Sequence, residues 1–189
     1  MKIRDFLLSA ITILSVFFAG CATTQSRENP INVNIAESVG FDPTPLCIAL
    51  FDLKGVKAQA IAGNWKDNNF TASCVMKGED EKFTIVFSAP QMRLVTIELT
   101  KPHTLKWKKA PQIPNAFEPE YAICDVAFAN LETSALKKAL GKNFSVVDDG
   151  IKRVISVGQK EIAILERSQA GSMKFTNPLR GYSYTIQNL

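Results

Sequence analysis

Residues 70–87 read FTASCVMKGEDEKFTIVF, and this stretch decides the fold. Every second residue over 70–76 is apolar, and after a charged turn at 77–80 the alternation resumes over 83–87. A period of two places neighbouring side chains on opposite faces of a strand, which is typical of a strand with one buried face. Two such strands separated by a short turn predict an antiparallel hairpin.

The same alternation extends along most of the chain. It predicts further strands at residues 95–99, 105–107, 144–148, 151–157, 161–166, 173–176 and 182–187. Turn residues such as proline and glycine stand between these segments. Short strands joined in sequence order by turns predict an antiparallel meander.

A helical region interrupts the strands. Residues 118–120 (EPE) are typical of a helix start, because proline is tolerated in the first turn and acidic side chains favour the positive end of the helix dipole. Apolar side chains follow at three- and four-residue spacing over 121–131, and a second helix over 131–140 is predicted to end at Gly141. The predicted fold class is α+β, with an antiparallel curled sheet, an incomplete β-barrel, covering a few short helices.

The N-terminus has the layout of a bacterial lipoprotein signal peptide over residues 1–20. Lys2 and Arg4 precede an apolar stretch over 6–18, which is too short for a stable transmembrane helix. Two small residues then stand directly before Cys21, whose thiol is the nucleophile that takes a diacylglyceryl group. We therefore expect cleavage before Cys21 and attachment to a membrane through acyl chains, such as palmitate, on that cysteine.

The residues after the cysteine set the expected location and division of the chain. In enteric bacteria an aspartate after the acylated cysteine retains a lipoprotein in the inner membrane, whereas this chain has Ala22. We therefore expect the periplasmic side of the outer membrane. Residues 21–45 are polar and contain three prolines, which predicts a lipidated N-terminus and flexible tether, shortened if 31–39 form a helix. Residues 46–189 then form one half-barrel domain.

Composition excludes one class of function and leaves the state of the cysteines open. The net charge is +4, and removal of residues 1–20 takes away two basic residues and one acidic residue, which leaves +3. This mild balance gives no support for nucleic-acid binding, which needs clustered basic side chains. Cys47, Cys74 and Cys124 would enter an oxidising compartment, either with one disulfide and one free thiol or as three buried thiols.

Five short motifs carry a resemblance to a known family: PQIP at 111–114, YAICD at 121–125, IKRVI at 151–155, GYSYTI at 181–186 and FSAP at 87–90. They resemble an uncharacterised family of bacterial outer-membrane lipoproteins with the half-barrel fold of the lipoprotein-localisation factors LolA and LolB. The resemblance implies that fold over most of the mature domain. Members of the family tend to be encoded with machinery for aryl polyene pigments, which resemble fatty acids in their synthesis, and for their export. The resemblance thus implies handling of an acylated product, with a protein partner in envelope export.

No constellation of catalytic or metal-binding residues stands out. His103 is the single histidine and has no nucleophile motif beside it, so we expect an exposed loop residue. A dyad of His103 with Cys74 or Cys124 stays open without support from any motif. The DDG sequence at 148–150 fits a hairpin turn and lacks the alternating ligands of a calcium loop. We expect no enzyme activity, no metal and no cofactor.

The concave face of the curled sheet is the expected ligand site. We expect six side chains to line its cavity: Phe70, Met76, Phe83, Phe87, Met92 and Trp107. A half-barrel can leave part of its apolar inner face to a ligand. We therefore expect a non-enzymatic outer-membrane lipoprotein that binds or helps to transfer a lipid, an acylated product or a lipoprotein. The alternative is a scaffolding envelope lipoprotein that recruits a protein partner through a sheet edge.

Overall fold

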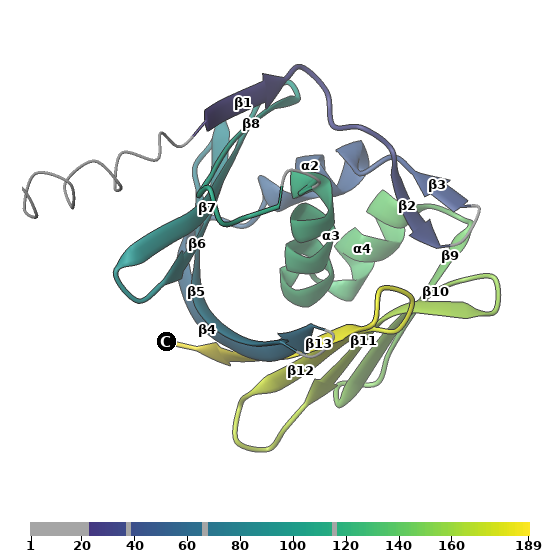
Figure 1. The fold of residues 1–189 in the computed structure, drawn as a ribbon. Helices are drawn as coiled ribbons and strands as arrows, with labels where there is room; N and C mark the ends of the chain where they lie inside the picture. Colours follow the sequence, from purple (N-terminus) through teal and green to yellow (C-terminus); the bar gives the residue numbers. More distant parts are fainter. Residues whose placement is uncertain (1–22, 37–38, 66–67, 115–116) are drawn as a thin grey trace, which may run out of the picture.

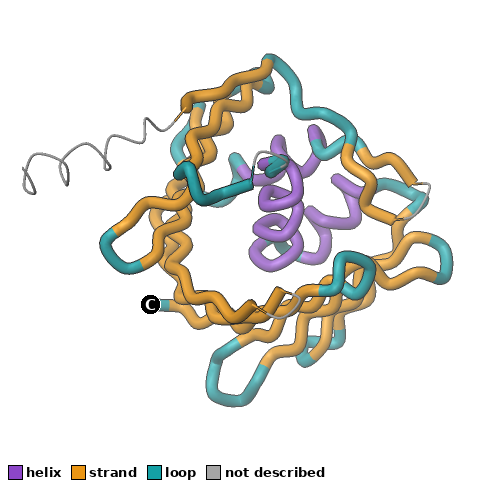
Figure 2. Tube along the Cα trace, in the orientation of Figure 1, coloured by secondary structure: helices purple, strands orange, loops and turns teal. Residues whose placement is uncertain are grey.

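The computed structural model describes residues 23–36, 39–65, 68–114 and 117–189, and shows one large antiparallel sheet curled around a group of helices (Figure 1). The helices are α2 (Thr44–Leu50), α3 (Pro119–Asn130) and α4 (Thr133–Leu140). The strands are β1 (Thr23–Arg27), β2 (Val33–Ala36), β3 (Val39–Phe41), β4 (Gly55–Trp65), β5 (Asn68–Gly78), β6 (Lys82–Ala89), β7 (Met92–Thr100), β8 (Thr104–Lys109), β9 (Phe144–Asp148), β10 (Lys152–Val157), β11 (Lys160–Arg167), β12 (Met173–Asn177) and β13 (Tyr182–Asn188). Figure 2 shows the helices enclosed by the curve of the strands.

The large sheet has the order β1-β8-β7-β6-β5-β4-β13-β12-β11-β10-β9. The C-terminal strand β13 pairs antiparallel with β4 and so joins the hairpins before the helices to the hairpins after them. β1 and β9 end the sheet and do not pair with each other among the described residues, so the barrel stays open. The predicted α+β class, with a curled antiparallel sheet around a few helices, is confirmed.

The hydrophobic core lies between the inner face of the sheet and the helices. Its largest fully buried side chains are Phe83 in β6, Phe128 in α3 and Phe175 in β12. α3 buries side chains on several sides, because the sheet curves around it (Figure 1). A helix that is apolar nearly all round belongs in such an enclosed position.

The boundaries of α3 and α4 follow from local signals that the sequence shows. α3 has Glu118 at its N-cap, proline in its first turn and Glu120 as an acidic residue there. α4 ends at Gly141, which has a φ of 74°, a conformation that glycine adopts without the steric cost of a Cβ. The two helices predicted between the strands are thus confirmed.

The tether predicted for residues 21–45 is wrong from Thr23 onward, because this segment belongs to the fold. β1 pairs with β8 along its whole length, beginning with Thr23 opposite Lys109. Pro30 and Val33 are buried, and β2 and β3 pair as an antiparallel hairpin, so residues 31–39 do not form the helix that would shorten a tether. Local periodicity did not reveal β1 because its sequence, TTQSR, contains no alternating apolar residues.

The three cysteines of the domain are free and buried, which decides between the two interpretations of the sequence. Cys47 lies in α2, Cys74 in β5 and Cys124 in α3. Among the described residues no helix is long and apolar enough to cross a membrane.

Candidate functional site

One row of residues crosses the inner face of the sheet over neighbouring strands. The backbone register places these residues opposite one another in the order Asp148, Arg153, Leu165, Phe175, Tyr184, Gly63 and Phe70. The row begins with an ion pair, continues through buried apolar side chains and ends at the ring of Phe70, which is 38% exposed. The row therefore runs from the buried ion pair of Asp148 and Arg153 to a partly exposed apolar surface at Phe70.

Four aromatic rings at the open end of this row form what we call the ring series: Phe175, Tyr184, Tyr182 and Phe70. The rings of Phe175 and Tyr184 stack with centroids 4.9 Å apart and planes 13° apart. Tyr182 stacks 6.2 Å from Tyr184, and Phe70 lies 6.5 Å from Tyr184 with its plane tilted. Phe175 is fully buried, the tyrosines are half-buried and Phe70 is exposed, so the ring series passes from core to surface.

Gly63 in β4 has no Cβ and so leaves room for Tyr184 of the ring series on the neighbouring strand. It stands directly opposite Tyr184 on one side and Phe70 on the other. A Cβ at this position would clash with the Cβ of Tyr184 and the carbonyl oxygen of Ser183. Aromatic neighbours across the strands cover the surface that a glycine leaves bare.

Asp125 on α3 faces the ring series and accepts a short hydrogen bond from it. The Tyr182 hydroxyl donates to Asp125 Oδ2 at 2.6 Å, and Asn177 Nδ2 donates to the Tyr182 oxygen at 3.3 Å. Burial raises the pKa of Asp125 to about 7, although hydrogen bonds from Tyr182 and Tyr184 and the charge of Arg180 lower it. Near neutral pH this carboxyl is therefore poised between its neutral and its charged form.

Arg180 in the turn between β12 and β13 closes the polar end of the ring series. Its guanidinium carbon lies 3.5 Å from the centroid of the Tyr121 ring and 5.7 Å from that of Tyr182. The Tyr121 hydroxyl donates to the carbonyl oxygen of Asn34 at 3.4 Å, which connects the first turn of α3 to β2. A cation on two aromatic rings therefore borders the inner face where the hairpin meets α3.

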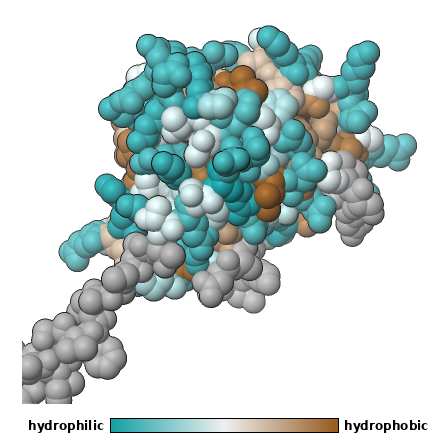
Figure 3. Space-filling model, turned by 90° about the horizontal axis from the view of Figure 1, so that it is seen from above, coloured by the Kyte–Doolittle hydropathy of each residue, from teal (hydrophilic) through white to brown (hydrophobic). Residues whose placement is uncertain are grey.

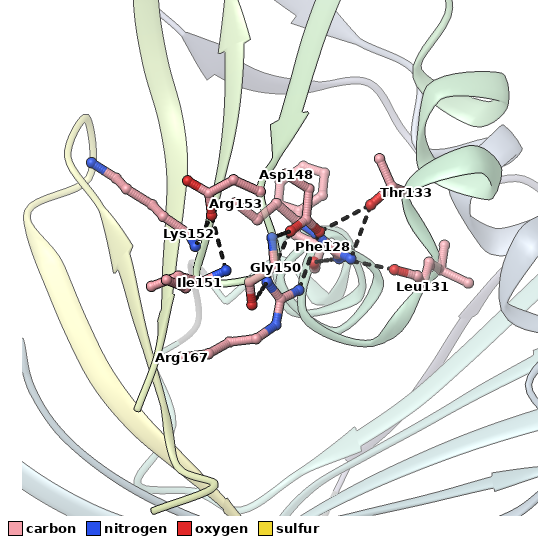
Figure 4. A network of polar contacts seen from close by, with 10 residues as sticks. Phe128, Leu131, Thr133, Asp148, Gly150, Ile151, Lys152, Arg153 and Arg167 are labelled. Carbon is pink, nitrogen blue, oxygen red and sulfur yellow. Dashed lines mark hydrogen bonds and ion pairs between the residues drawn. The ribbon is translucent and has the colours of Figure 1, made fainter. Parts of the chain in front are cut away.

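Arg153 in β10 binds the end of α3 and, through Thr133 Oγ1 at 3.4 Å, the start of α4 (Figure 4). Its Nη1 donates to the carbonyl oxygens of Phe128 and Leu131, both at 2.8 Å, at the end of α3 where carbonyls lack partners within the helix. Its Nε donates to Asp148 Oδ2 at 2.7 Å. Arg167 binds the same carboxylate at 2.9 and 3.2 Å, and Arg167 together with Arg153 holds the pKa of Asp148 well below its usual range.

A second ion cluster fastens β1 to the start of α3. Arg27 donates to Glu120 Oε1 at 3.1 Å and to Glu118 Oε2 at 3.2 Å, and its guanidinium carbon lies 4.5 Å from the centroid of the Trp107 ring. The Glu120 side chain is fully buried, and its Oε1 also accepts from the main-chain nitrogen of Ile31 at 3.1 Å. The N-terminal segment thus helps to position the helix that carries Asp125.

Three of the six predicted cavity residues lie in the core: Met76, Phe83 and Trp107. Their exposed fractions are 3%, 1% and 5%, and all three belong to the cluster of buried apolar side chains. They point inward as the alternation predicts, but other side chains of the protein fill the space around them. In this structure they support the fold and do not line an open cavity.

The other predicted site residues have different surroundings. Phe87 is half-buried against the core beside a β-bulge, and Met92 at the start of β7 is 38% exposed. Phe70, exposed to the same extent, is the predicted residue that belongs to the ring series. Cys21 lies outside the described residues. Of the predicted cavity residues, the structure therefore places Phe70 in the ring series.

Two shallow grooves, of about 420 and 430 Å³, lie over β4, β5 and β13. Both are lined by Ala62, Thr71 and Thr185, which alternate with the inward-facing residues, and the first also borders Phe70 and Tyr184.

The face of the molecule shown in Figure 3 is mostly hydrophilic, with small separate apolar areas. The ring series with its polar end combines apolar surface and convergent polar groups, as binding sites typically do.

The described residues hold no arrangement typical of an active centre. His103 in the turn before β8 is half-buried, contrary to the expected exposure, and its Nδ1 has no hydrogen-bond partner among these residues. Burial raises the pKa of Cys47 and Cys74 to about 12 and that of Cys124 well above its ordinary value, so the thiols stay protonated at neutral pH. No cluster of described residues could hold a metal ion.

Sequence reasoning missed most of the polar part of this site. Asp125, Arg153 and the two tyrosines of the ring series were not predicted as site residues, yet each lies inside one of the motifs YAICD, IKRVI and GYSYTI. Those motifs were the signal that could have found them. That Asp125 meets Tyr182, which is 57 residues away, depends on the tertiary fold.

An open antiparallel sheet curled around helices, with an aromatic series on its inner face, defines the class of this protein as an α+β incomplete barrel. Residues 57–189 match the family described as "Protein of unknown function (DUF3261)", and the chain belongs to that family. No curated protein matches it. A crystal structure of a DUF1329 family protein from Desulfovibrio piger ATCC 29098 is similar with 9% sequence identity and a TM-score of 0.34, over 78% of this chain and 90% of that one.

Proposed function

We propose that this protein is a non-enzymatic lipoprotein of the outer membrane that binds a lipid or another acylated molecule on the inner face of its curled sheet. The molecule would lie on the ring series and be held there or passed on, as in a LolA/LolB-like carrier. The observation that supports this proposal most is the gradient along the ring series, from the fully buried Phe175 to Phe70 at 38% exposure. An apolar surface that begins in the core and opens to solvent suits an apolar ligand.

Apolar contact alone would give such a molecule useful affinity. Each buried methylene contributes about 0.8 kcal/mol, so eight of them would contribute about 6 kcal/mol. Association itself costs several kcal/mol, and rigid aromatic side chains keep that cost low because they have few torsions to immobilise. The rings of Tyr182 and Tyr184 are already held by their contacts with Asp125, so little ordering remains to be done on binding.

The proposed anchor would keep the ring series near its source of lipid. Cys21 precedes Thr23, the first residue of β1, by two positions. Two extended residues span at most about 7 Å, so an acylated Cys21 would hold the sheet against the bilayer. A site tethered so closely meets membrane lipids at a high effective concentration.

Photo-crosslinking in a membrane tests this proposal. The full lipidated chain is placed in phosphatidylcholine nanodiscs together with a fatty acid that carries a diazirine near its methyl end. We expect crosslinked peptides from β4, β5 and β13 around the ring series. Phe70→Ala removes an exposed aromatic contact and should lower the yield about fivefold, since such contacts contribute on the order of 1 kcal/mol.

Val147→Ala is the matched control, because Val147 is also an exposed apolar residue, at 62%, but lies on β9 at the far edge of the sheet. Its crosslinking yield should equal that of the unchanged chain. The lipid-binding proposal fails if the unchanged chain gives no crosslinks around the ring series on β4, β5 and β13. It also fails if Phe70→Ala and Val147→Ala have the same effect.

A scaffolding function is supported by a different feature, the edge strand β9. This strand has β10 as its one neighbour in the sheet, and Val147 and Ile151 beside that edge are 62% and 71% exposed. An edge strand can add a strand from another protein. In a scaffold, lysine at both positions would abolish crosslinking to proteins of the native envelope and leave fatty-acid crosslinking unchanged.

A further inference from the structure

The guanidinium of Arg180 has an unusual environment for a charged group beside an apolar face. Its main-chain nitrogen donates to Asn177 Oδ1 at 3.0 Å, which holds the turn between β12 and β13. The guanidinium carbon lies over the ring of Tyr121, 3.5 Å from its centroid, and 5.7 Å from the ring centroid of Tyr182. Among the described residues the guanidinium nitrogens of Arg180 make no hydrogen bond or ion pair, although the charge acts on Asp125 and lowers its pKa.

Other arginines along the inner side of the sheet are neutralised. Arg27 pairs with Glu118 and Glu120, and Arg153 and Arg167 both pair with one aspartate, with nitrogen–oxygen distances of 3.2, 3.1, 2.7 and 2.9 Å. Stacking on a ring uses the face of a guanidinium, whereas its five N–H donors point outward in its plane. The aromatic rings therefore orient the Arg180 donors and leave them available.

Apolar surface continues from Arg180 along the ring series. Leu179, the preceding residue in the turn, is 40% exposed. Tyr182 is followed by Tyr184 at 6.2 Å and then by Phe70 at 6.5 Å, so the rings form a connected path away from the guanidinium. A positive group at one end of an apolar path has the polarity of a site for an amphiphile.

We propose that Arg180, oriented by Tyr121 and Tyr182, binds the anionic head group of an amphiphile, a carboxylate or a phosphate, whose tail lies along the ring series. This inference rests on the proposed lipid binding and adds the class of ligand and the polarity with which it binds. A guanidinium fork matches the paired oxygens of both head groups.

Asp125 is the carboxyl that could compete with an anionic ligand for Arg180, but its hydrogen bond comes from Tyr182. The Tyr182 hydroxyl binds it at 2.6 Å, on the side of α3 that faces the ring series. Because burial raises the pKa of Asp125 to about 7, a large fraction of this carboxyl is neutral near pH 7 and does not repel an anion. The charge of Arg180 acts on this carboxyl and lowers its pKa, but no ion pair joins the two side chains among the described residues, so the guanidinium donors can still bind a ligand.

The experiment compares a charged probe with a neutral probe in the full lipidated chain in phosphatidylcholine nanodiscs. The diazirine fatty acid and its methyl ester have the same tail and differ in the head group. Arg180→Gln should lower the crosslinking yield of the acid about tenfold, the usual effect of losing a charge-assisted hydrogen bond, and leave the ester unchanged. Arg180→Lys should recover part of the yield, because it keeps the charge without the fork.

Arg93→Gln is the matched control, since Arg93 is an exposed arginine of β7 and the change in net charge is the same. It should leave both probes unaffected. Equal losses of acid and ester in Arg180→Gln would overturn the head-group assignment and leave lipid binding intact. Absence of inner-face crosslinks in the unchanged chain would instead remove the proposed function. An alkyl phosphate of the same tail should compete with the acid, and competition by inorganic phosphate alone would overturn the requirement for a tail.

Discussion

Replacing Arg153 with methionine tests whether one buried side chain holds the helices inside the curled sheet. The residue is 4% exposed and joins β10 to the end of α3 through the carbonyl oxygens of Phe128 and Leu131. It also binds Asp148, which Arg167 holds from the other side. Methionine has a similar length and no charge, so it removes these bonds without a large cavity.

The expected loss of stability follows from the groups that are left behind. Breaking a buried ion pair by removing one partner costs about 3–5 kcal/mol, and each buried carbonyl without a donor costs about 1–3 kcal/mol. These contributions are not additive, and Arg167 still neutralises Asp148 in the variant. We therefore expect Arg153→Met to lower the free energy of unfolding by about 3–5 kcal/mol, a large share of the 5–15 kcal/mol typical of a domain.

The assay is equilibrium urea unfolding followed by circular dichroism, with Arg93→Met as the control. Arg93 is exposed, so its replacement should change the free energy of unfolding by less than about 0.5 kcal/mol. The m-value should stay the same in both variants, since the surface exposed on unfolding does not change. A loss below about 1 kcal/mol in Arg153→Met would show that the network in Figure 4 is not what holds α3 and α4.

The same network makes a prediction about acid. Because its folded pKa is lowered, mainly by Arg167 and also by Arg153, Asp148 stabilises the fold above its unfolded pKa of 3.8. That stabilisation is lost as the pH falls below about 4 toward the folded pKa. In Arg153→Met the loss of stability over this acidic range should be smaller than in the unchanged chain, and an equal loss would contradict the role given to Arg153.

Three further predictions test other parts of the molecule. Burial raises the folded pKa of Asp125 to about 7, so its contribution to stability is present below pH 4 and is lost as the pH rises through 7. The free energy of unfolding of Asp125→Asn, measured relative to the unchanged chain, should therefore rise by up to a few kcal/mol between pH 4 and pH 8. The same difference at both pH values would argue against the raised pKa. Phe83→Ala should cost about 3–5 kcal/mol in urea unfolding, and Phe87→Ala clearly less, because the first ring is 1% exposed and the second is half-buried; equal losses would mean that Phe87 is core. Cys21→Ser should abolish incorporation of labelled palmitate and remove the protein from outer-membrane fractions, and labelling that persists would exclude this cysteine as the anchor.

The parts of the fold that could be predicted depend on residues that are close together in the sequence. Strands 70–78 and 82–89 alternate in hydrophobicity and are joined by a short turn, so both the strands and their pairing follow from local residues. The start of α3 and the end of α4 at Gly141 are likewise set by capping residues. Local signals of this kind also exist for α2 (Thr44–Leu50), where Pro45 lies in the first turn, yet the helix was missed because it is short.

What covers each side of the sheet could not be predicted, because alternation assigns a face without showing its neighbours. Phe70 and Met76 point to the same side of β5, yet one is 38% and the other 3% exposed. Met76 belongs to the cluster of buried core residues, whereas Phe70 lies near the start of β5, beside the turn from β4. The bulge beside Phe87 further changes the local twist. The contact between Asp125 and Tyr182 could not be predicted either, because it joins segments 57 residues apart in the chain.

The segment before residue 45 would join the proposed anchor and the domain into one mechanical unit. β1 contributes backbone hydrogen bonds to β8 and one cation to Glu118 and Glu120, so it needs no apolar periodicity of its own. Because β1 begins two residues after Cys21, an acyl group there could not move away from the sheet unless β1 separated from β8. With the proposed anchor next to β1 at one edge of the sheet, and the ring series near its middle on β5, β12 and β13, a bound lipid would have to cross the surface of the domain. Transfer would then depend on the path along the protein and not on the swing of a long tether.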